Sequence, residues 1–320
     1  QQIGLPLLVG GSQAAASVIL RGPDRVIRAH QDRNRSLYSG DVSFGDPEFW
    51  AKPFGSWADQ DDRKGVSGYS ARTGGLAVGA DAAFSDTARA GIAFVYSNAD
   101  VTGNSSVAPN SANVDAYQLI GYGNVALDPV SQLSYQLGLG MLRNDGLRGI
   151  PLADLSAQSA YDSLAATAAV NLSRAYKSSE QTTFTPSIGA EYTWIKDEAY
   201  TETGADALNL AVDGRNADSL VLAIEGEVAH EITPNTALKA NVGVGYDVLQ
   251  DQSSITSAFA GAPGAIFTTE GLDQNPWLVR GGFGLESEVR TGMEVSARYD
   301  VEYREDFLNQ TASVNLRLAF

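Results

Sequence analysis

The chain has 320 residues, a formal net charge of −16 and no cysteine. The acidic balance argues against nucleic acid as a partner, because contacts with phosphate require a basic surface. The absence of cysteine excludes disulfides and thiolate sites, and no apolar run approaches the roughly 20 residues of a membrane-spanning helix.

The first segment, residues 1–46, differs from the rest of the chain. Residues 12–20 are rich in alanine and prone to form a helix, whereas residues 24–37 carry few apolar side chains. A helix that is polar on nearly all sides requires water or a polar cavity. The segment holds five arginines, Arg21, Arg25, Arg28, Arg33 and Arg35. They form either a solvated helix face or a set of partners for carboxylates in a cavity, and the acidic body that follows favours the cavity.

From residue 47 onward, apolar and polar residues alternate with the period of a β-strand in about twelve segments. Short turns alternate with long polar loops, and most segments are long enough to cross a bilayer at a tilt, which takes roughly 9–11 residues. A soluble sandwich gives no reason for this alternation of connections. The segments are 49–58, 69–84, 89–98, 114–127, 133–142, 163–176, 183–195, 219–230, 238–249 and 277–289, followed by a closing hairpin at 293–320.

The closing hairpin shows the pattern most clearly. Odd positions from Met293 to Tyr303 are apolar, even positions are polar or charged, and the chain stops on the aromatic residue Phe320. A terminal edge strand is a template for pairing with another sheet. We therefore expect Phe320 to act as an assembly signal.

The second face of the strands carries charges, and glycine or alanine fills much of the rest. In a closed barrel this face lines a lumen, and about twelve strands leave room for one helix but not for a folded domain. We expect the small residues of the second strand to leave space for that helix. The charged residues assigned to the lumen are Asp81, Glu191, Glu225, Glu227, Arg280, Glu286, Glu288, Glu294, Arg298, Asp300, Glu302, Arg304 and Arg317.

Aromatic residues near the strand ends predict a girdle at the membrane interface. The residues assigned to it are Trp50, Trp57, Trp194, Trp277, Tyr299 and Tyr303. Together these patterns predict an all-β membrane protein, a 12-stranded antiparallel transmembrane β-barrel over residues 47–320. Residues 1–46 are predicted to form a linker and an α-helix that lies inside the pore, with the N-terminus toward the long loops.

Three stretches resemble the C-terminal translocator domain of an autotransporter of the type Va secretion class. They are the aromatic first strand Phe49-Trp50-Ala51-Lys52-Pro53-Phe54-Gly55-Ser56-Trp57, the second strand from Gly68-Tyr69 to Ala80-Asp81, and the ending Leu316-Arg317-Leu318-Ala319-Phe320. The second-strand motif is fairly specific, whereas a terminal aromatic residue is common to most outer-membrane barrels. The resemblance covers essentially the whole chain.

The resemblance implies an outer-membrane protein of a Gram-negative bacterium that anchors and exports an N-terminal passenger. The partners that it implies are the passenger, the barrel-assembly machinery, periplasmic chaperones, and outer-membrane lipid and lipopolysaccharide, with the barrel itself monomeric. Some members of the family cleave the passenger in the pore at an asparagine, aided by an acidic residue. Asn34, close to Asp32, is the candidate for such a site, but a helix-surface asparagine is the favoured interpretation.

We expect neither an enzyme nor a cofactor. The two histidines, His30 and His230, are too few and too far apart in the sequence to suggest a metal cluster. Two alternatives to a translocator remain open. One is a small porin-like channel that its N-terminal helix gates, and the other is a soluble all-β binding protein.

Overall fold

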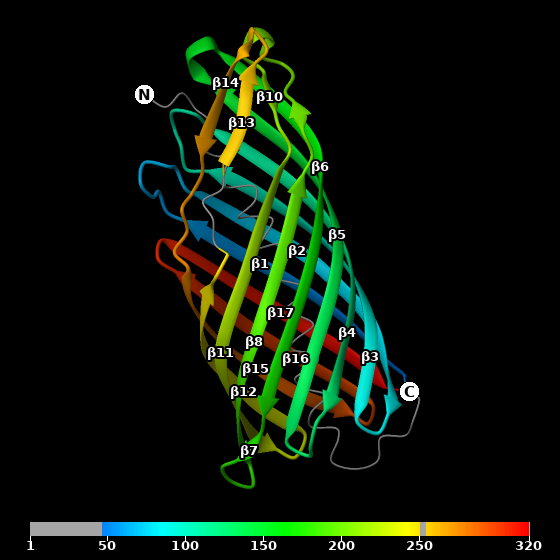
Figure 1. Cartoon of the computed structure of the whole chain (residues 1–320). Coiled ribbons are helices and arrows are strands. Elements are labelled where there is room, and N and C mark those ends of the chain that lie inside the picture. The colour runs from blue at the N-terminus through cyan, green and yellow to red at the C-terminus, as the bar shows by residue number, and fades with distance from the viewer. Residues whose placement is uncertain (1–46, 250–253, 320) are drawn as a thin grey trace.

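The computed structural model describes residues 47–249 and 254–319, which form a closed antiparallel β-barrel of twelve long strands (Figure 1). Each long strand pairs with the next long strand in the sequence, and β1 pairs with β17 to close the barrel. The predicted fold class is confirmed for the barrel. Its strands are β1 (Pro47–Gln60), β2 (Tyr69–Ser85), β3 (Ala88–Gly103), β4 (Asn110–Ala126), β5 (Ser131–Ile150), β6 (Leu155–Arg174), β8 (Thr182–Asp197), β11 (Arg215–Thr233), β12 (Thr236–Asp247), β15 (Trp277–Arg290), β16 (Met293–Arg304) and β17 (Phe307–Ala319).

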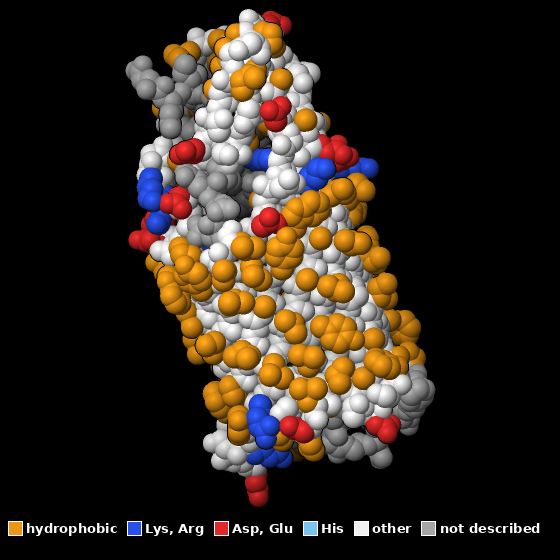
Figure 2. Space-filling model, in the orientation of Figure 1, with side chains coloured by type: hydrophobic (Ala, Val, Ile, Leu, Met, Phe, Trp, Pro, Cys, Tyr) orange, Lys and Arg blue, Asp and Glu red, His pale blue; other side chains and the backbone are white. Residues whose placement is uncertain are grey.

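Successive side chains of a strand point to opposite faces of the sheet. In β1 the even positions are buried while the odd positions are mostly exposed, and in β17 the odd positions are the buried ones. The outward positions carry large apolar side chains such as Leu137, Ile224 and Phe283. On the face shown in Figure 2 they form an apolar belt, with charged side chains above and below it. A belt of this kind suits the hydrocarbon region of a bilayer.

The two ends of the barrel differ, as the alternation of connections predicts. One end has short turns, and the other carries longer strands and loops, including a second sheet of four strands (Figure 1). This small sheet contains β9 (Tyr200–Thr201), β10 (Leu210–Val212), β13 (Ser254–Phe259) and β14 (Ala262–Glu270). Two 3₁₀ turns also lie at this end: η2 (Pro151–Ala153) in the short connection between β5 and β6, and η3 (Asp206–Leu208) in the long connection between β8 and β11. At the other end, β7 (Tyr176–Lys177) pairs with β8 beyond the end of β6.

Several strands extend well into regions that the sequence predicts as loops. The ladder between β5 and β6 continues to the pair Ile150↔Leu155, although residues 143–160 were predicted to be a loop. Above the apolar belt both faces of a strand are polar, so the hydrophobic alternation disappears while the backbone pairing continues. No helix in the described part of the chain is long and apolar enough to cross a membrane.

Trp50 was assigned to the interfacial girdle, and this assignment is wrong. Trp50 points inward and is 3% exposed, whereas Trp57 is 46% exposed on the outward face. The expectation that small residues of the second strand leave open space also needs correction. A Cβ at Gly79 would meet the Trp50 ring at 2.5 Å, and a Cβ at Gly75 would meet the Phe54 ring at 2.3 Å. These glycines accept aromatic rings from the neighbouring strand.

Candidate functional site

Two parts of the inward face of the barrel differ chemically. The neutral wall, formed by β4, β5 and β6, presents mainly small residues, amides and hydroxyl groups, and Arg148 is the single charged inward side chain of these three strands. The charged wall is formed by β8, β11, β12, β15 and β16. Its inward acids outnumber its inward bases; the acids are Glu191, Asp197, Glu225, Glu227, Asp247, Glu286, Glu294, Asp300 and Glu302, and the bases are Arg215, Lys239, Arg280, Arg298 and Arg304.

Arg280 on β15 is the centre of the charged wall. Its two terminal nitrogens donate to the two carboxylate oxygens of Glu191 on β8, each over 2.8 Å. Its Nε donates to Glu302 over 3.1 Å, and Nη1 lies 3.3 Å from Glu225. The side chains of Arg280 and Glu302 are 7% and 3% exposed. One guanidinium therefore neutralises carboxylates from three other strands, and a bidentate pair of this kind fixes geometry as well as charge.

A second group of charges lies nearer the short-turn end. Arg298 donates to Asp300 over 2.8 Å and to the Asn241 side chain over 2.9 Å, and it lies 3.8 Å from Glu227. Lys239 pairs with Glu286 over 2.8 Å. A small cavity of about 30 Å³ lies among these side chains and is lined by Lys52, Glu227, Lys239, Glu286, Arg298 and Asn315. A polar cavity of this size is large enough to hold a water molecule.

A third cluster joins the first and last strands at the short-turn end. Glu48 on β1 bonds to Arg317 on β17 and lies 3.2 Å from Arg89 on β3. Arg89 also donates to Asp81 over 3.0 Å. The hydroxyl of Tyr122 donates to Asp81 over 2.8 Å and accepts a bond of 2.7 Å from the Trp50 indole. The inward position of Trp50 thus belongs to a buried polar chain that crosses four neighbouring strands and β17.

At the long-loop end, the connection between β8 and β11 folds over the neutral wall. Arg148 forms a bidentate pair with Glu202, and these side chains are 5% and 1% exposed. The Tyr161 and Tyr200 rings stack with centroids 4.5 Å apart. On the opposite side, Arg304 lies 3.7 Å from both Asp247 and Glu302. The mouth of the barrel is therefore lined by contacts between strands and long connections.

The thirteen residues predicted for the lumen fall into these groups with one exception. Twelve have inward side chains that form ion pairs, in the clusters above or, for Glu294, with Arg317 over 3.6 Å. They are Asp81, Glu191, Glu225, Glu227, Arg280, Glu286, Glu294, Arg298, Asp300, Glu302, Arg304 and Arg317. Glu288 is exposed at the end of β15, where the register shifts before the turn. The predicted helix residues Arg21, Arg25, Arg28, Arg33 and Arg35, together with Asn34 and Phe320, lie outside the described residues.

Several residues of these clusters were missed by the sequence analysis. Glu48 and Lys52 sit at even positions of β1 and would follow from the alternation, but aromatic residues on both faces of this strand hide the pattern. Arg89 lies at the start of β3, next to the short turn that follows β2. Glu202 lies in a loop, where the sequence has no strand periodicity. Within residues 47–249 and 254–319, no group of three or more His, Asp or Glu side chains is arranged to hold a metal ion.

A polar lumen inside an apolar belt, with short turns at one end and long loops at the other, is the architecture of an outer-membrane barrel. A family model described as the autotransporter beta-domain matches residues 49–300. The chain belongs to the autotransporter β-domain family. This β-domain lies in the outer membrane of a Gram-negative bacterium, and in such barrels the long loops are extracellular and the short turns periplasmic.

Solved structures and curated sequences agree with this assignment. The translocator domain of the autotransporter NalP from Neisseria meningitidis superposes with a TM-score of 0.78 at 15% identity, over 98% of this chain and 99% of that one. The β-domain of the Bordetella autotransporter BrkA gives 0.62 at 15% identity, over 87% of this chain and 100% of that one. Outer membrane protein A of Rickettsia conorii is 27% identical over 92% of this chain, which spans only 15% of that protein's length.

Proposed function

We propose that this β-domain anchors a passenger, attached to its N-terminal side, in the outer membrane and exports it to the cell surface. The observation that supports the proposal is a polar lumen with an acidic charged wall, in a member of the autotransporter β-domain family. An unfolded peptide that crosses the membrane needs a polar, hydrated lumen with few apolar surfaces to which it could bind. The curated relatives are several times longer than this chain, since it spans about 15% of their length, so there is room for a passenger in proteins of this kind.

Within this function, residues 1–46 serve as the linker and as a helix that occupies the pore after export. The charged wall supports this role, because its carboxylates outnumber its cations and can receive Arg21, Arg25, Arg28, Arg33 and Arg35. Arginines cannot lie in lipid without a cost of several kcal/mol each. A lumen with fixed negative potential concentrates and orients cationic groups. The barrel residues thus bind and position a segment of the chain and do not perform catalysis, and Asn34 belongs to the helix surface.

Assembly requires the barrel-assembly machinery, with periplasmic chaperones that protect the unfolded strands. The monomeric barrel then meets outer-membrane lipid and lipopolysaccharide through its apolar belt and extracellular rim. Phe320 completes the terminal strand as an assembly signal, because an unpaired edge offers backbone groups to another sheet. Deletion of Phe320 should reduce the amount of heat-modifiable barrel in the outer membrane while synthesis continues. Equal amounts with and without Phe320 would refute this role.

The proposed export is tested with a small epitope-tagged reporter placed after a signal peptide and before residue 1. We expect the reporter to be accessible to antibody and to proteinase K on intact cells. The same reporter with the signal peptide but without the β-domain is the control, and it should remain in the periplasm. A reporter that stays periplasmic while the barrel is folded in the outer membrane would contradict export and leave the alternative of a porin-like channel.

A further inference from the structure

The connection between β1 and β2 forms a small hairpin at the extracellular end of the barrel. Arg63 and Val66 exchange two backbone hydrogen bonds of 2.9 Å. The two residues between them, Lys64 and Gly65, have φ angles of 50° and 81°. Positive φ at both central positions is typical of a type I′ turn, which matches the twist of the flanking strands. The tip of this connection therefore has one defined shape.

This hairpin folds inward across the end of the barrel. Val66 is 7% exposed and belongs to a buried cluster with the inward side chains of Tyr69, Val101 and Phe307. Leu272, from the connection between β14 and β15, is 5% exposed and joins the same cluster. Two extracellular connections thus place apolar side chains over the inward face of β1, β2, β3 and β17. A second apolar cluster, around Leu210, Val212 and Ile255, belongs to the small four-stranded sheet. The cluster around Val66 therefore forms a separate, local apolar seal.

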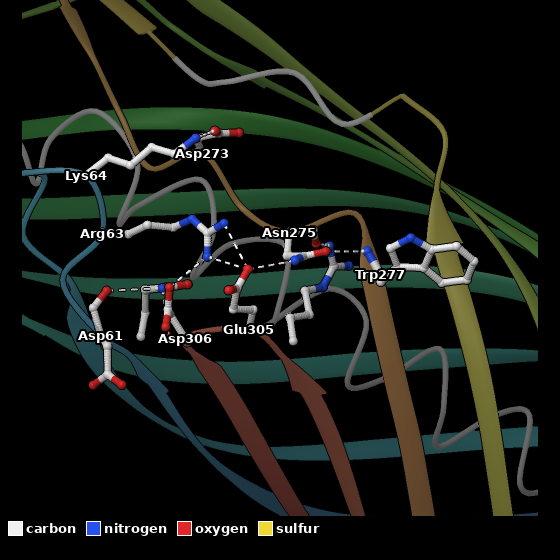
Figure 3. A network of polar contacts seen from close by, with 10 residues as sticks. Asp61, Arg63, Lys64, Asp273, Asn275, Trp277, Glu305 and Asp306 are labelled. Carbon is white, nitrogen blue, oxygen red and sulfur yellow. Dashed lines mark hydrogen bonds and ion pairs between the residues drawn. The ribbon is translucent and has the colours of Figure 1, made fainter.

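Ion pairs hold the hairpin in this position (Figure 3). Arg63 lies 2.7 Å from Asp306 and 3.1 Å from Glu305, both in the turn between β16 and β17. Asn275 donates to the same oxygen of Glu305 over 2.8 Å, and Lys64 lies 2.5 Å from Asp273. Together these contacts tie three extracellular connections into one unit.

Backbone and amide contacts reinforce the same unit. The amide of Asp61 donates to the carbonyl of Asp306 over 2.8 Å, and the Gln60 side chain donates to that carbonyl over 2.9 Å. These contacts cross the junction where the first strand meets the last strand. The carboxylates are more exposed than the seal beneath them, since the side chains of Glu305 and Asp306 are 58% and 37% exposed. Water and salt can therefore reach the ionic part while the apolar part stays dry.

We propose that the β1–β2 hairpin is an extracellular gate, which the ion pairs of Arg63 hold shut over the mouth of the barrel. The gate opens by rotation of the hairpin away from Glu305 and Asp306, which uncovers Val66 and the inward face of β1. Because the hairpin lies beyond the ends of β1 and β2 and its carboxylate partners are exposed, opening requires no unfolding of the barrel wall. The gate is a property of the barrel itself. Its use in letting a passenger out rests on the proposed function.

The natural absence of cysteine allows a direct test in the full chain. Ala58 faces inward beneath the hairpin and is 2% exposed, so an Ala58→Cys thiol should react slowly with a membrane-impermeant maleimide added outside intact cells. Adding Arg63→Glu replaces attraction to Glu305 and Asp306 with repulsion. We expect labelling to accelerate about tenfold, which corresponds to about 1.4 kcal/mol. The charge swap Arg63→Glu with Glu305→Arg should restore slow labelling.

Two controls separate a gate from a loosened barrel. Arg174→Glu makes the same change of charge in the background of Ala58→Cys, but at the periplasmic end beside Asp128, and it should leave the labelling rate unchanged. Leu152→Cys, at a residue that is 97% exposed, should label fast in every background. The heat-modifiable band must keep its transition temperature in Arg63→Glu. If this variant fails to assemble, Arg63→Gln carries the same test with an expected acceleration of about threefold, since only the attraction is lost.

The gate is refuted if Ala58→Cys labels at one rate with and without Arg63→Glu, if it labels fast in the otherwise unchanged chain, or if acceleration appears only with a lowered transition temperature. The readout does not depend on a passenger. If labelling responds to Arg63→Glu as expected but the reporter is not exported, only the proposed function is refuted. If the reporter is exported but the labelling rate does not respond to Arg63→Glu, only the gate is refuted.

Discussion

The neutral and charged walls of the lumen have the same backbone architecture but are held together in different ways. On the neutral wall, side chains such as Gln118, Asn144 and Thr167 are buried and uncharged. On the charged wall, Arg280 alone meets carboxylates from β8, β11 and β16. The alternation of residues makes both walls polar, but only the charged wall creates a directed field. A basic guest in the pore should therefore lie against the charged wall.

The largest effect should come from breaking the centre of the charged wall. Arg280→Met leaves Glu191, Glu225 and Glu302 without their shared cation, and removing one member of a buried ionic group costs about 3–5 kcal/mol. The free energy of unfolding, measured by urea titration in lipid vesicles, should fall by about that amount. Gln118→Leu on the neutral wall is the matched control. Among the residues that the structure describes, the Gln118 Oε1 has no hydrogen-bond partner, so this change should be close to neutral. Equal losses for both variants would contradict the distinction between the walls.

A smaller effect is expected at the periplasmic end, in the cluster that joins the first and last strands. Glu48→Gln keeps the size of the side chain but removes the charge that links Arg317 to Arg89. Each arginine retains another acid, Glu294 or Asp81, so we expect a loss of about 2 kcal/mol, the value of a charge-assisted hydrogen bond. Glu227→Gln removes a longer contact of 3.8 Å to Arg298 and should cost clearly less in the same titration. A larger loss for Glu227→Gln would reverse this ranking.

Packing between β1 and β2 gives the next prediction. Gly79→Ala places a methyl group 2.5 Å from the Trp50 ring, and overpacking of a rigid aromatic contact should cost about 1–2 kcal/mol. Gly121→Ala is the matched control, because a Cβ there meets no atom of residues 47–249 or 254–319 within 4 Å. It should be neutral or slightly stabilising. Equal stabilities of the two variants, compared by thermal band shift on gels, would show that the ring does not occupy the glycine.

The smallest effect concerns charges outside the membrane. The Asn275 amide and then the Arg63 guanidinium lower the pKa of Glu305 below its ordinary value of 4.5. A lowered pKa stabilises the folded contact above the unfolded value and loses that contribution as the pH falls through the folded pKa. The charged groups around Glu305 are Arg63, Lys64 and Asp306, with Asp273 next to Lys64.

We therefore expect hydrogen-exchange protection of the Asp61 amide, corrected for its intrinsic rate, to be constant near neutral pH and to decrease slightly below pH 4.5. Glu305→Gln should remove the part of this decrease that comes from Glu305. A protection factor that falls as the pH rises toward neutrality would have the wrong sign and would contradict the assignment of Glu305 as an ionised partner of Arg63.

The sequence predicts the barrel well because lipid outside the barrel and water in its lumen require apolar and polar residues to alternate along each strand. It predicts the charged face of the closing hairpin for the same reason. It does not predict which charges meet, since the contact between Arg280 and Glu191 joins residues 89 positions apart and depends on barrel closure. Trp50 was misplaced because its type, and not its even position in β1, decided the assignment. Glu202 and Val66 lie in connections where no periodicity exists.

The central claim is that the lumen is an acidic path which a basic N-terminal segment occupies, and single-channel recording in planar bilayers tests it most directly. We predict that the intact chain conducts weakly. Removal of residues 1–40 should raise the conductance several-fold, by roughly the amount expected for clearing one helix from a lumen of this strand number. The open pore should prefer cations, and the preference should fall when Glu225 and Glu227 are changed to Gln. An unchanged conductance after truncation, or a preference for anions, would contradict the account.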